Sequence, residues 1–170
     1  MIRLAAFLLS CLLAHDTAAA QSSNWFQVAI VVFAQPLNTE EDLTGQSPLN
    51  WPAEMREPDP VLEDQSGLYS AYQLLRNAPG FRPLLHLAWL QPAASGQVNP
   101  PYHVSGETVE GTVSIERGEY LYALVDMQYR AADGSIYQLR ERRQIKLGEV
   151  HYLDHPAFGV LIRVAPAQVP

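Results

Sequence analysis

Polar and apolar residues alternate along most of the carboxy-terminal half of the chain, a pattern typical of strands that are buried on one face. Gly118 and the Asp133-Gly134 pair interrupt this alternation where hairpin turns are expected. The strands predicted in this half are residues 109–117, 120–130, 136–147 and 158–165. The short connections between the first three predict an antiparallel meander.

The amino-terminal half contains two further strands and one helix. Residues 25–34 are apolar at almost every position, which is typical of a central strand buried on both faces. Residues 66–78 place apolar side chains at helical spacing, begin at the capping residue Ser66 and end before Pro79-Gly80. Residues 81–90 return as a strand. This order predicts an α+β fold, with a single curved, mainly antiparallel β-sheet and one main helix packed on a face.

Two polar segments are predicted to be loops. Residues 35–65 hold eight acidic residues, one arginine and five prolines, a composition that forms no conventional core element. Trp51 is the exception in this segment, and we expect it to pin the loop to the body of the domain. Residues 91–103 form a second loop rich in proline, glycine and serine. A connection as long as 35–65 in a compact domain is often functional.

Residues 1–20 have the pattern of a secretory signal peptide. Arg3 precedes an apolar run, residues 4–14, that is too short for a stable membrane anchor. The run is followed by Ala18-Ala19-Ala20, which fits a signal-peptidase site. Cleavage after these alanines would leave residues 21–170 as a single mature domain.

Cys11 is the only cysteine, so the mature chain would contain no disulfide. An exported protein without disulfides suits a bacterial periplasm. The residues around Cys11 also look like a lipoprotein processing site, which would anchor the protein in a membrane. Too few apolar residues precede Cys11 for a normal signal of that kind, and simple cleavage is therefore favoured.

The formal net charge of −7 makes the chain a poor candidate for nucleic-acid binding, which depends on a basic surface. No segment after residue 20 is long and apolar enough to span a membrane.

Basic side chains gather on one predicted strand, where Arg140, Arg142 and Lys146 share a face. They are either a solvated row that prevents edge-to-edge pairing of sheets, or a strip that binds carboxylates, which guanidinium groups grip with paired hydrogen bonds. Cell-wall peptides are rich in carboxylates. Several tyrosines could stack on sugar rings, although core packing explains most of them equally well.

A second polar group precedes the last strand and consists of His151, Tyr152, Asp154 and His155. The histidines and Asp154 are donors that zinc could use, but they are not on a helix, where such histidines would converge. Pro156 favours a turn, and we interpret His151 and Asp154 as hydrogen-bonded to the backbone of this corner. No metal site is therefore predicted.

Catalytic motifs are missing from the chain. There is no nucleophile elbow and no phosphate-binding glycine loop, and acidic pairs occur without a specific spacing. The sequence predicts no enzymatic activity and no cofactor.

Four blocks of sequence carry a family resemblance. They are WFQVAIVVFAQ (25–35), LLHLAWLQP (84–92), GTVSIERGEYLYALVDMQYR (111–130) and LRERRQIKLGEVHYLDHPAFGVLIRV (139–164). In order and spacing they resemble the CsiV family, small periplasmic peptidoglycan-binding proteins of Gram-negative bacteria. The resemblance extends over nearly the whole mature chain, and its most specific part runs from Arg142 to Pro156.

The resemblance implies a peptidoglycan-binding accessory protein without catalytic activity. Such a protein would support cell-wall synthesis, and with it cell shape, through a class A penicillin-binding protein and its outer-membrane lipoprotein activator. The resemblance supplies no ligand site. The candidate ligand-binding residues come from local chemistry and are Arg140, Arg142, Lys146, His151, Tyr152, Asp154 and His155.

Two other functions are open at this point. One is an envelope protein–protein adaptor without wall affinity, which would dock through residues 35–65 or through an exposed strand edge. The other, more weakly supported, is a metal-dependent hydrolase that uses His151, Asp154 and His155.

Overall fold

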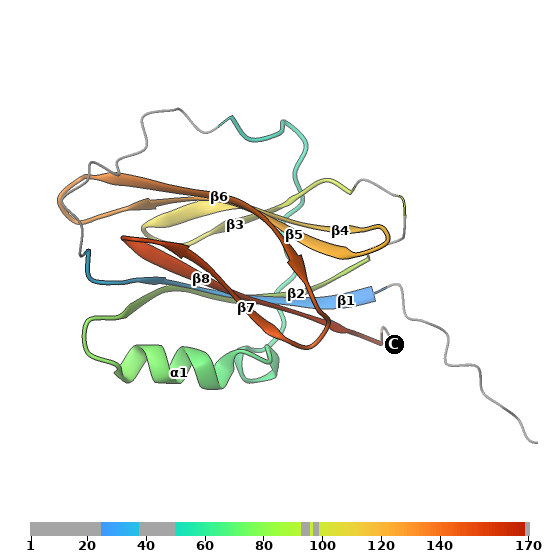
Figure 1. Cartoon of the computed structure of the whole chain (residues 1–170), viewed down its shortest axis with the longest axis horizontal. Coiled ribbons are helices and arrows are strands. Elements are labelled where there is room, and N and C mark those ends of the chain that lie inside the picture. The colour runs from blue at the N-terminus through green and yellow to red at the C-terminus, as the bar shows by residue number, and fades with distance from the viewer. Residues whose placement is uncertain (1–24, 38–49, 93–95, 97–98, 169–170) are drawn as a thin grey trace, which may run out of the picture.

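The computed structural model describes residues 25–37, 50–92, 96 and 99–168. Within them, eight strands form two four-stranded antiparallel sheets that pack face to face, and a helix covers the outer side of one sheet (Figure 1). The predicted signal peptide, Cys11 and part of each predicted loop lie outside the described residues.

Each sheet collects strands from distant parts of the chain. Sheet A has the order β2-β1-β8-β7, and sheet B has the order β3-β4-β5-β6. The bounds in sheet A are β1 Trp25–Ala34, β2 Arg82–Pro92, β7 Val150–His155 and β8 Phe158–Pro166. Those in sheet B are β3 Tyr102–Ser105, β4 Val109–Arg117, β5 Leu121–Arg130 and β6 Ile136–Ile145. The helix α1 is Tyr69–Asn77, after a 3-10 turn at Glu63–Gln65.

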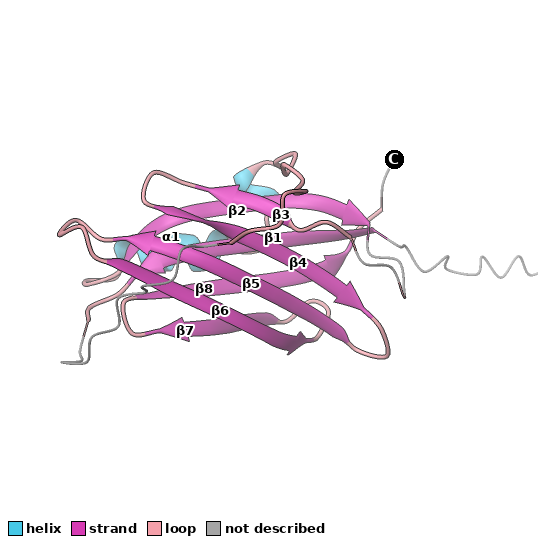
Figure 2. Cartoon of the chain, turned by 90° about the horizontal axis from the view of Figure 1, so that it is seen from above, coloured by secondary structure: helices cyan, strands magenta, loops and turns pink. Residues whose placement is uncertain are grey.

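The prediction of a single curved sheet is wrong, because the strands divide into two sheets whose directions cross obliquely (Figure 2). Alternation along a strand shows that one face is buried, but it does not show which sheet the strand joins. Sequence analysis also missed one strand of each sheet. Two of the four residues of β3 fall in the predicted loop 91–103, and β7 falls in the segment that was interpreted as a corner before Pro156.

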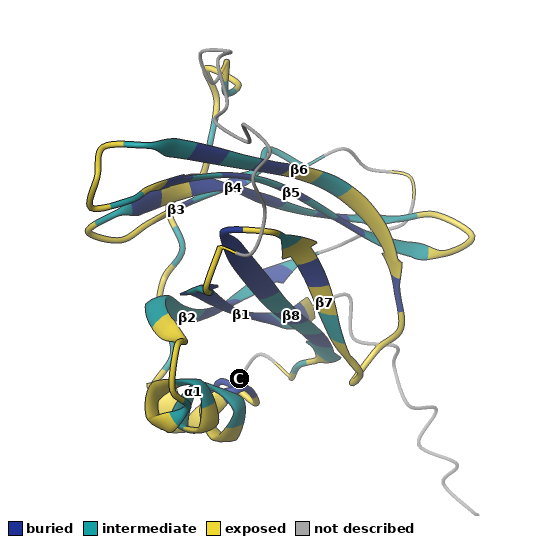
Figure 3. Ribbon diagram, turned by 60° about the vertical axis from the view of Figure 1, so that its left-hand side comes forward, coloured by how far each residue is buried: buried dark blue, intermediate teal, exposed yellow. Residues whose placement is uncertain are grey.

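The core has two parts, and β1 belongs to both. Its residues Phe26, Val28, Ile30 and Val32 face sheet B and form part of the main core between the sheets. The alternate residues Ala29, Val31 and Phe33 pack with Leu68 and Ala88 on the side that α1 covers. Figure 3 shows the buried interior between the sheets and the exposed outer side of the helix. The prediction of a strand buried on both faces is confirmed for residues 28–33, whereas Trp25 at the start of β1 is exposed.

Two tight turns position the later strands. At the predicted hairpin, Gly134 has φ 87° and the Ser135 N–H donates to Asp133 Oδ1 at 2.9 Å, so this turn is confirmed. Gly148 has φ 80° in the connection that carries the chain from β6 in sheet B to β7 in sheet A. Glycine adopts this left-handed backbone without the steric cost of a Cβ atom.

The helix starts later than predicted, at Tyr69 rather than Ser66. Ser66 instead closes the preceding turn, since its Oγ accepts the N–H of Leu68 at 3.1 Å and lies 2.7 Å from Nε2 of His86 in β2. The ring of Tyr72 stacks on His86 at 4.7 Å and holds α1 against sheet A. Because Ser66 is completely buried, this serine–histidine contact is closed to any substrate.

Residues 50–61, which we call the strap, run from the outer face of sheet B around one edge of the sandwich to sheet A. The Arg56 N–H donates to the Pro101 carbonyl at 2.9 Å, and the Arg56 carbonyl accepts the His103 N–H at 2.8 Å. At the far end, the Val61 N–H donates to the Ala88 carbonyl at 2.8 Å. The strap therefore covers the β3 and β2 edges of the two sheets.

Gly111→Ala should destabilise the fold by about 1–3 kcal/mol, because a Cβ at this position would overlap the Asp126 carbonyl oxygen and come within 2.6 Å of Met127 Cγ. Gly118→Ala is the matched control, since no atom lies within 4 Å of a Cβ there. Urea unfolding measures both free energies. Equal stabilities of the two variants would contradict the packing described for β4 and β5.

Candidate functional site

The outer face of sheet B, which points away from sheet A, carries two rows of mainly polar side chains. The β4–β5–β6 register aligns Thr112 with Asp126 and Arg140, and aligns Ser114 with Leu124 and Arg142. Above these rows lies a hollow of about 560 Å³ that we call the sheet B groove. Its lining is Asn50, Pro52, Asn99, Pro101, Thr112, Ser114, Leu124, Val125, Asp126, Arg140, Glu141 and Arg142.

Both arginines of the groove pair with carboxylates of this chain. Arg140 donates to Asp126 Oδ2 through Nη2 at 2.6 Å and through Nε at 2.8 Å. Arg142 binds Glu116 Oε2 at 3.2 Å, and its guanidinium carbon lies 3.6 Å from the centre of the Tyr122 ring. The two arginine side chains are 72% and 52% exposed. Exposed ion pairs contribute only about 0–1 kcal/mol, so a ligand carboxylate can replace Glu116 at small cost, whereas Asp126 is only 21% exposed and its pair with Arg140 costs more to break.

Neutral polar groups lie beside these ion pairs. The hydroxyls of Thr112 and Ser114 have no hydrogen-bond partner among the described residues. The amides of Asn50 and Asn99 line the walls of the groove. The groove thus offers both donors and acceptors above a partly apolar surface.

His103 on β3 fixes the strap that forms one wall. Its Nδ1 lies 2.9 Å from Glu57 on the strap, its Nε2 lies 3.0 Å from Glu110 on β4, and its side chain is 19% exposed. Burial acts to lower the pKa of His103, but hydrogen bonds to the two carboxylates outweigh it, and the pKa is raised. The Trp51 ring lies 6.0 Å from the His103 ring, so the predicted contact of Trp51 with the body of the domain is confirmed.

The second predicted group lies on the strand β7, and the turn predicted at Pro156 follows it, so the turn is confirmed but the interpretation of residues 151–155 as a corner is wrong. Because side chains on a strand alternate, His151 and His155 point between the sheets with Leu153, whereas Tyr152 and Asp154 point to the side covered by α1. The two histidines are four residues apart, which separates them by roughly 13 Å in a strand. They cannot share a metal ion, and the described residues contain no group of three or more potential ligands.

Each histidine of β7 accepts a backbone hydrogen bond. His151 Nε2 accepts the Lys146 N–H at 3.0 Å, which confirms its predicted role in holding the backbone. His155 Nδ1 accepts the Ala157 N–H at 3.1 Å, and burial lowers the pKa of His155. The Lys146 ammonium lies 3.7 Å from Glu149 in the connection between β6 and β7.

On the other side of β7, Asp154 bonds to side chains rather than to the backbone as predicted. Its Oδ1 accepts the Tyr152 hydroxyl and the Gln35 amide, the latter at 3.0 Å. Burial, followed by the hydrogen bond to Asp154, raises the pKa of Tyr152 to about 12. Tyr152 therefore stays protonated at neutral pH, and its ring stacks on Phe33 at 6.0 Å.

The seven predicted ligand-binding residues therefore occupy separate parts of the fold. Only Arg140 and Arg142 line the sheet B groove. Sequence analysis missed Thr112, Ser114, Asn99 and Pro101. The polar alternation Glu110, Thr112, Ser114, Glu116 was the available signal for the two hydroxyls.

Residues 53–167 match the protein family described as "Peptidoglycan-binding protein, CsiV". The chain belongs to this family. The match covers more than half of the chain and includes every strand except β1. The resemblance described from the sequence began earlier, at residue 25, and so included β1. No curated protein and no solved structure matches the chain. Among its described residues, no helix is long and apolar enough to cross a membrane.

His103 should make stability depend on pH. Because its folded-state pKa is raised above 6.5, the stabilisation is fully present below about pH 6.5 and is lost as the pH rises through the raised value. His103→Gln should therefore lower the free energy of unfolding more at about pH 5.5 than above about pH 8. Urea unfolding across this range measures the difference.

Glu57→Gln/Glu110→Gln is the matched variant for this test, because it keeps His103 but removes both charges that raise its pKa. It should lose the same pH-dependent stability as His103→Gln. Parallel stability curves for wild type and both variants would exclude the His103 contacts with Glu57 and Glu110 as the source of a pH-dependent stability.

Proposed function

We propose that this protein binds peptidoglycan through the sheet B groove. The observation that carries the proposal is a hollow of about 560 Å³ with two arginines, two hydroxyls and two amides, in a member of a peptidoglycan-binding family. Concave sites with a few convergent polar groups on a partly apolar surface are typical binding sites for small ligands.

The groove chemistry favours the peptide part of the wall polymer. Arg140 and Arg142 offer planar donors for a carboxylate, which would exchange with Asp126 or Glu116. Leu124 and the prolines of the lining, Pro52 and Pro101, suit short apolar side chains. None of the described lining residues is aromatic, so the groove offers no stacking surface for a sugar ring.

The wider role in our proposal is that of an accessory protein in the periplasm. Residues 1–20 would direct export and be removed, which leaves a mature domain of residues 21–170. By holding the wall polymer, the protein would support synthesis by a class A penicillin-binding protein and its outer-membrane lipoprotein activator. Its part would be binding and not catalysis.

Arg140→Ala/Arg142→Ala should lower the fraction of protein that pellets with purified peptidoglycan sacculi several-fold, because both carboxylate donors are lost. The effect should be larger at low salt, where exposed charges are least screened. Arg76→Ala/Lys146→Ala is the charge-matched control and should pellet like wild type, since Arg76 is on α1 and Lys146 is outside the groove. Wild-type protein that stays in the supernatant would exclude the proposed function.

Ser114→Trp should abolish pelleting without loss of stability. Residue 114 lies on the solvent side of β4, so an indole there would fill the groove while leaving the core between the sheets unchanged. Thermal unfolding checks the fold, and sacculus co-sedimentation measures binding. Normal pelleting of this variant would place the wall-binding surface elsewhere on the molecule.

A further inference from the structure

A second hollow lies on the other side of the strap. It has a volume of about 430 Å³, and we call it the edge pocket. Its lining is Trp25, Arg56, Glu57, Asp59, Pro60, Val61, Leu90, Pro92 and Tyr102. The pocket therefore lies between the start of β1, the end of β2, the start of β3 and the second half of the strap.

The chemistry of the edge pocket differs from that of the sheet B groove in two respects. Its lining includes two aromatic residues, of which Tyr102 is buried against Trp89 and Trp25 is 38% exposed, so the accessible aromatic face is that of Trp25. Its polar groups, Arg56 and the carboxylates Glu57 and Asp59, give a negative balance. Such a pocket disfavours a ligand carboxylate, whereas its carboxylates accept hydrogen bonds from hydroxyl groups.

An aromatic face beside planar hydrogen-bonding groups suits a sugar ring. The C–H face of the ring packs on the indole, and its hydroxyls bond to the carboxylate and guanidinium groups. We infer that the edge pocket binds a neutral sugar ring of the glycan strand while the sheet B groove holds the attached peptide. This inference rests on the proposed function and extends it to a second site.

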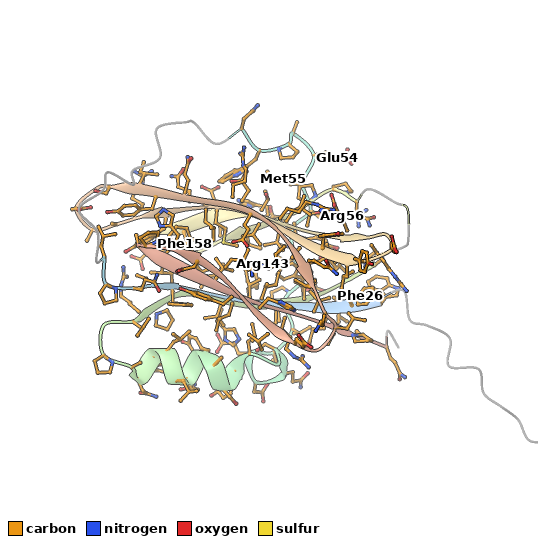
Figure 4. All side chains as sticks on the ribbon, viewed as in Figure 1. Phe26, Glu54, Met55, Arg56, Arg143 and Phe158 are labelled. Carbon is orange, nitrogen blue, oxygen red and sulfur yellow. The ribbon has the colours of Figure 1, made fainter. Side chains whose placement is uncertain are left out.

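The two hollows lie on either side of the strap and adjoin where β3 begins. Pro101 lines the groove and the next residue, Tyr102, lines the edge pocket, and consecutive Cα atoms are about 3.8 Å apart. Arg56 is hydrogen-bonded to Pro101 and to His103, so the strap crosses between the two hollows at this point. Figure 4 shows the strap descending from Glu54 to Arg56 beside the sheets.

The charged groups of the two hollows suit different parts of the ligand. The arginines of the groove suit the carboxylate-bearing peptide, and the carboxylates of the edge pocket suit the uncharged hydroxyls of the sugar. A ligand that fills both hollows should bind more tightly than either part alone, since the second contact forms within one complex.

The test uses calorimetric titration of the full mature chain with three probes: glycan oligomers stripped of peptide, free stem peptide, and disaccharide-peptide fragments. Trp25→Ala and Asp59→Asn should each weaken binding of the stripped glycan, by roughly tenfold for the loss of the indole, and leave binding of the free peptide unchanged. Ser114→Trp should weaken binding of the free peptide and leave binding of the stripped glycan unchanged. Tyr120→Ala, which removes an aromatic ring that is 50% exposed outside both hollows, should change neither.

The outcomes separate the two proposals. Stripped glycan that fails to bind wild type, or binds Trp25→Ala and Asp59→Asn as well as wild type, overturns the sugar site while peptide binding still supports the groove. Loss of free-peptide binding in Asp59→Asn would show that the edge pocket holds the peptide, for example its amino group, and would also overturn the inference. If none of the three probes binds wild type, the proposed function itself fails. Asp59→Asn keeps the test valid if Trp25→Ala does not fold, because Asp59 is exposed on the strap.

Discussion

The burial of β1 on both faces is the constraint on which the rest of the structure depends. One set of its side chains completes the core between the sheets, and the alternate set anchors α1 and the turn at Ser66. A shift of one residue in its pairing would exchange these two sets and disturb both cores together. With sheet A fixed between two layers, the outer face of sheet B is the one broad sheet surface that no helix of the described residues covers (Figure 1).

The strap converts this sheet face into a site with walls. A four-stranded antiparallel sheet with alternating polar residues is normally a flat, solvated surface. Here an acidic, proline-rich segment crosses its edge and is held by the backbone pairing at Arg56 and by the contacts of His103. Prolines limit the conformations of such a segment in the unfolded chain, which lowers the entropic cost of ordering it. Hollows form on both sides of it, each with different chemistry.

Local patterns of the sequence predicted most of the elements, but not how they assemble. Composition identified β1 as a central strand, and Asp133-Gly134 identified the hairpin between β5 and β6, because both depend on residues close in sequence. The division into two sheets depends on pairing between β1 and β8, more than a hundred residues apart, which no local pattern encodes. Only part of the sheet B groove could be predicted from the sequence, for the same reason. Arg140 and Arg142 formed a visible row, whereas the strap and the residues before β3 meet this row only in the folded chain.

The family match begins at residue 53, after β1 has ended. In sheet A, however, β1 lies between β2 and β8 and pairs with both along almost its whole length. A fragment trimmed to the matched region would leave these two strands without their shared neighbour. Each would then present an open row of backbone donors and acceptors flanked by apolar side chains, a template for intermolecular β-pairing. Recombinant work on this protein should therefore retain the segment from Trp25 onward, since the shorter fragment is expected to accumulate as insoluble aggregate.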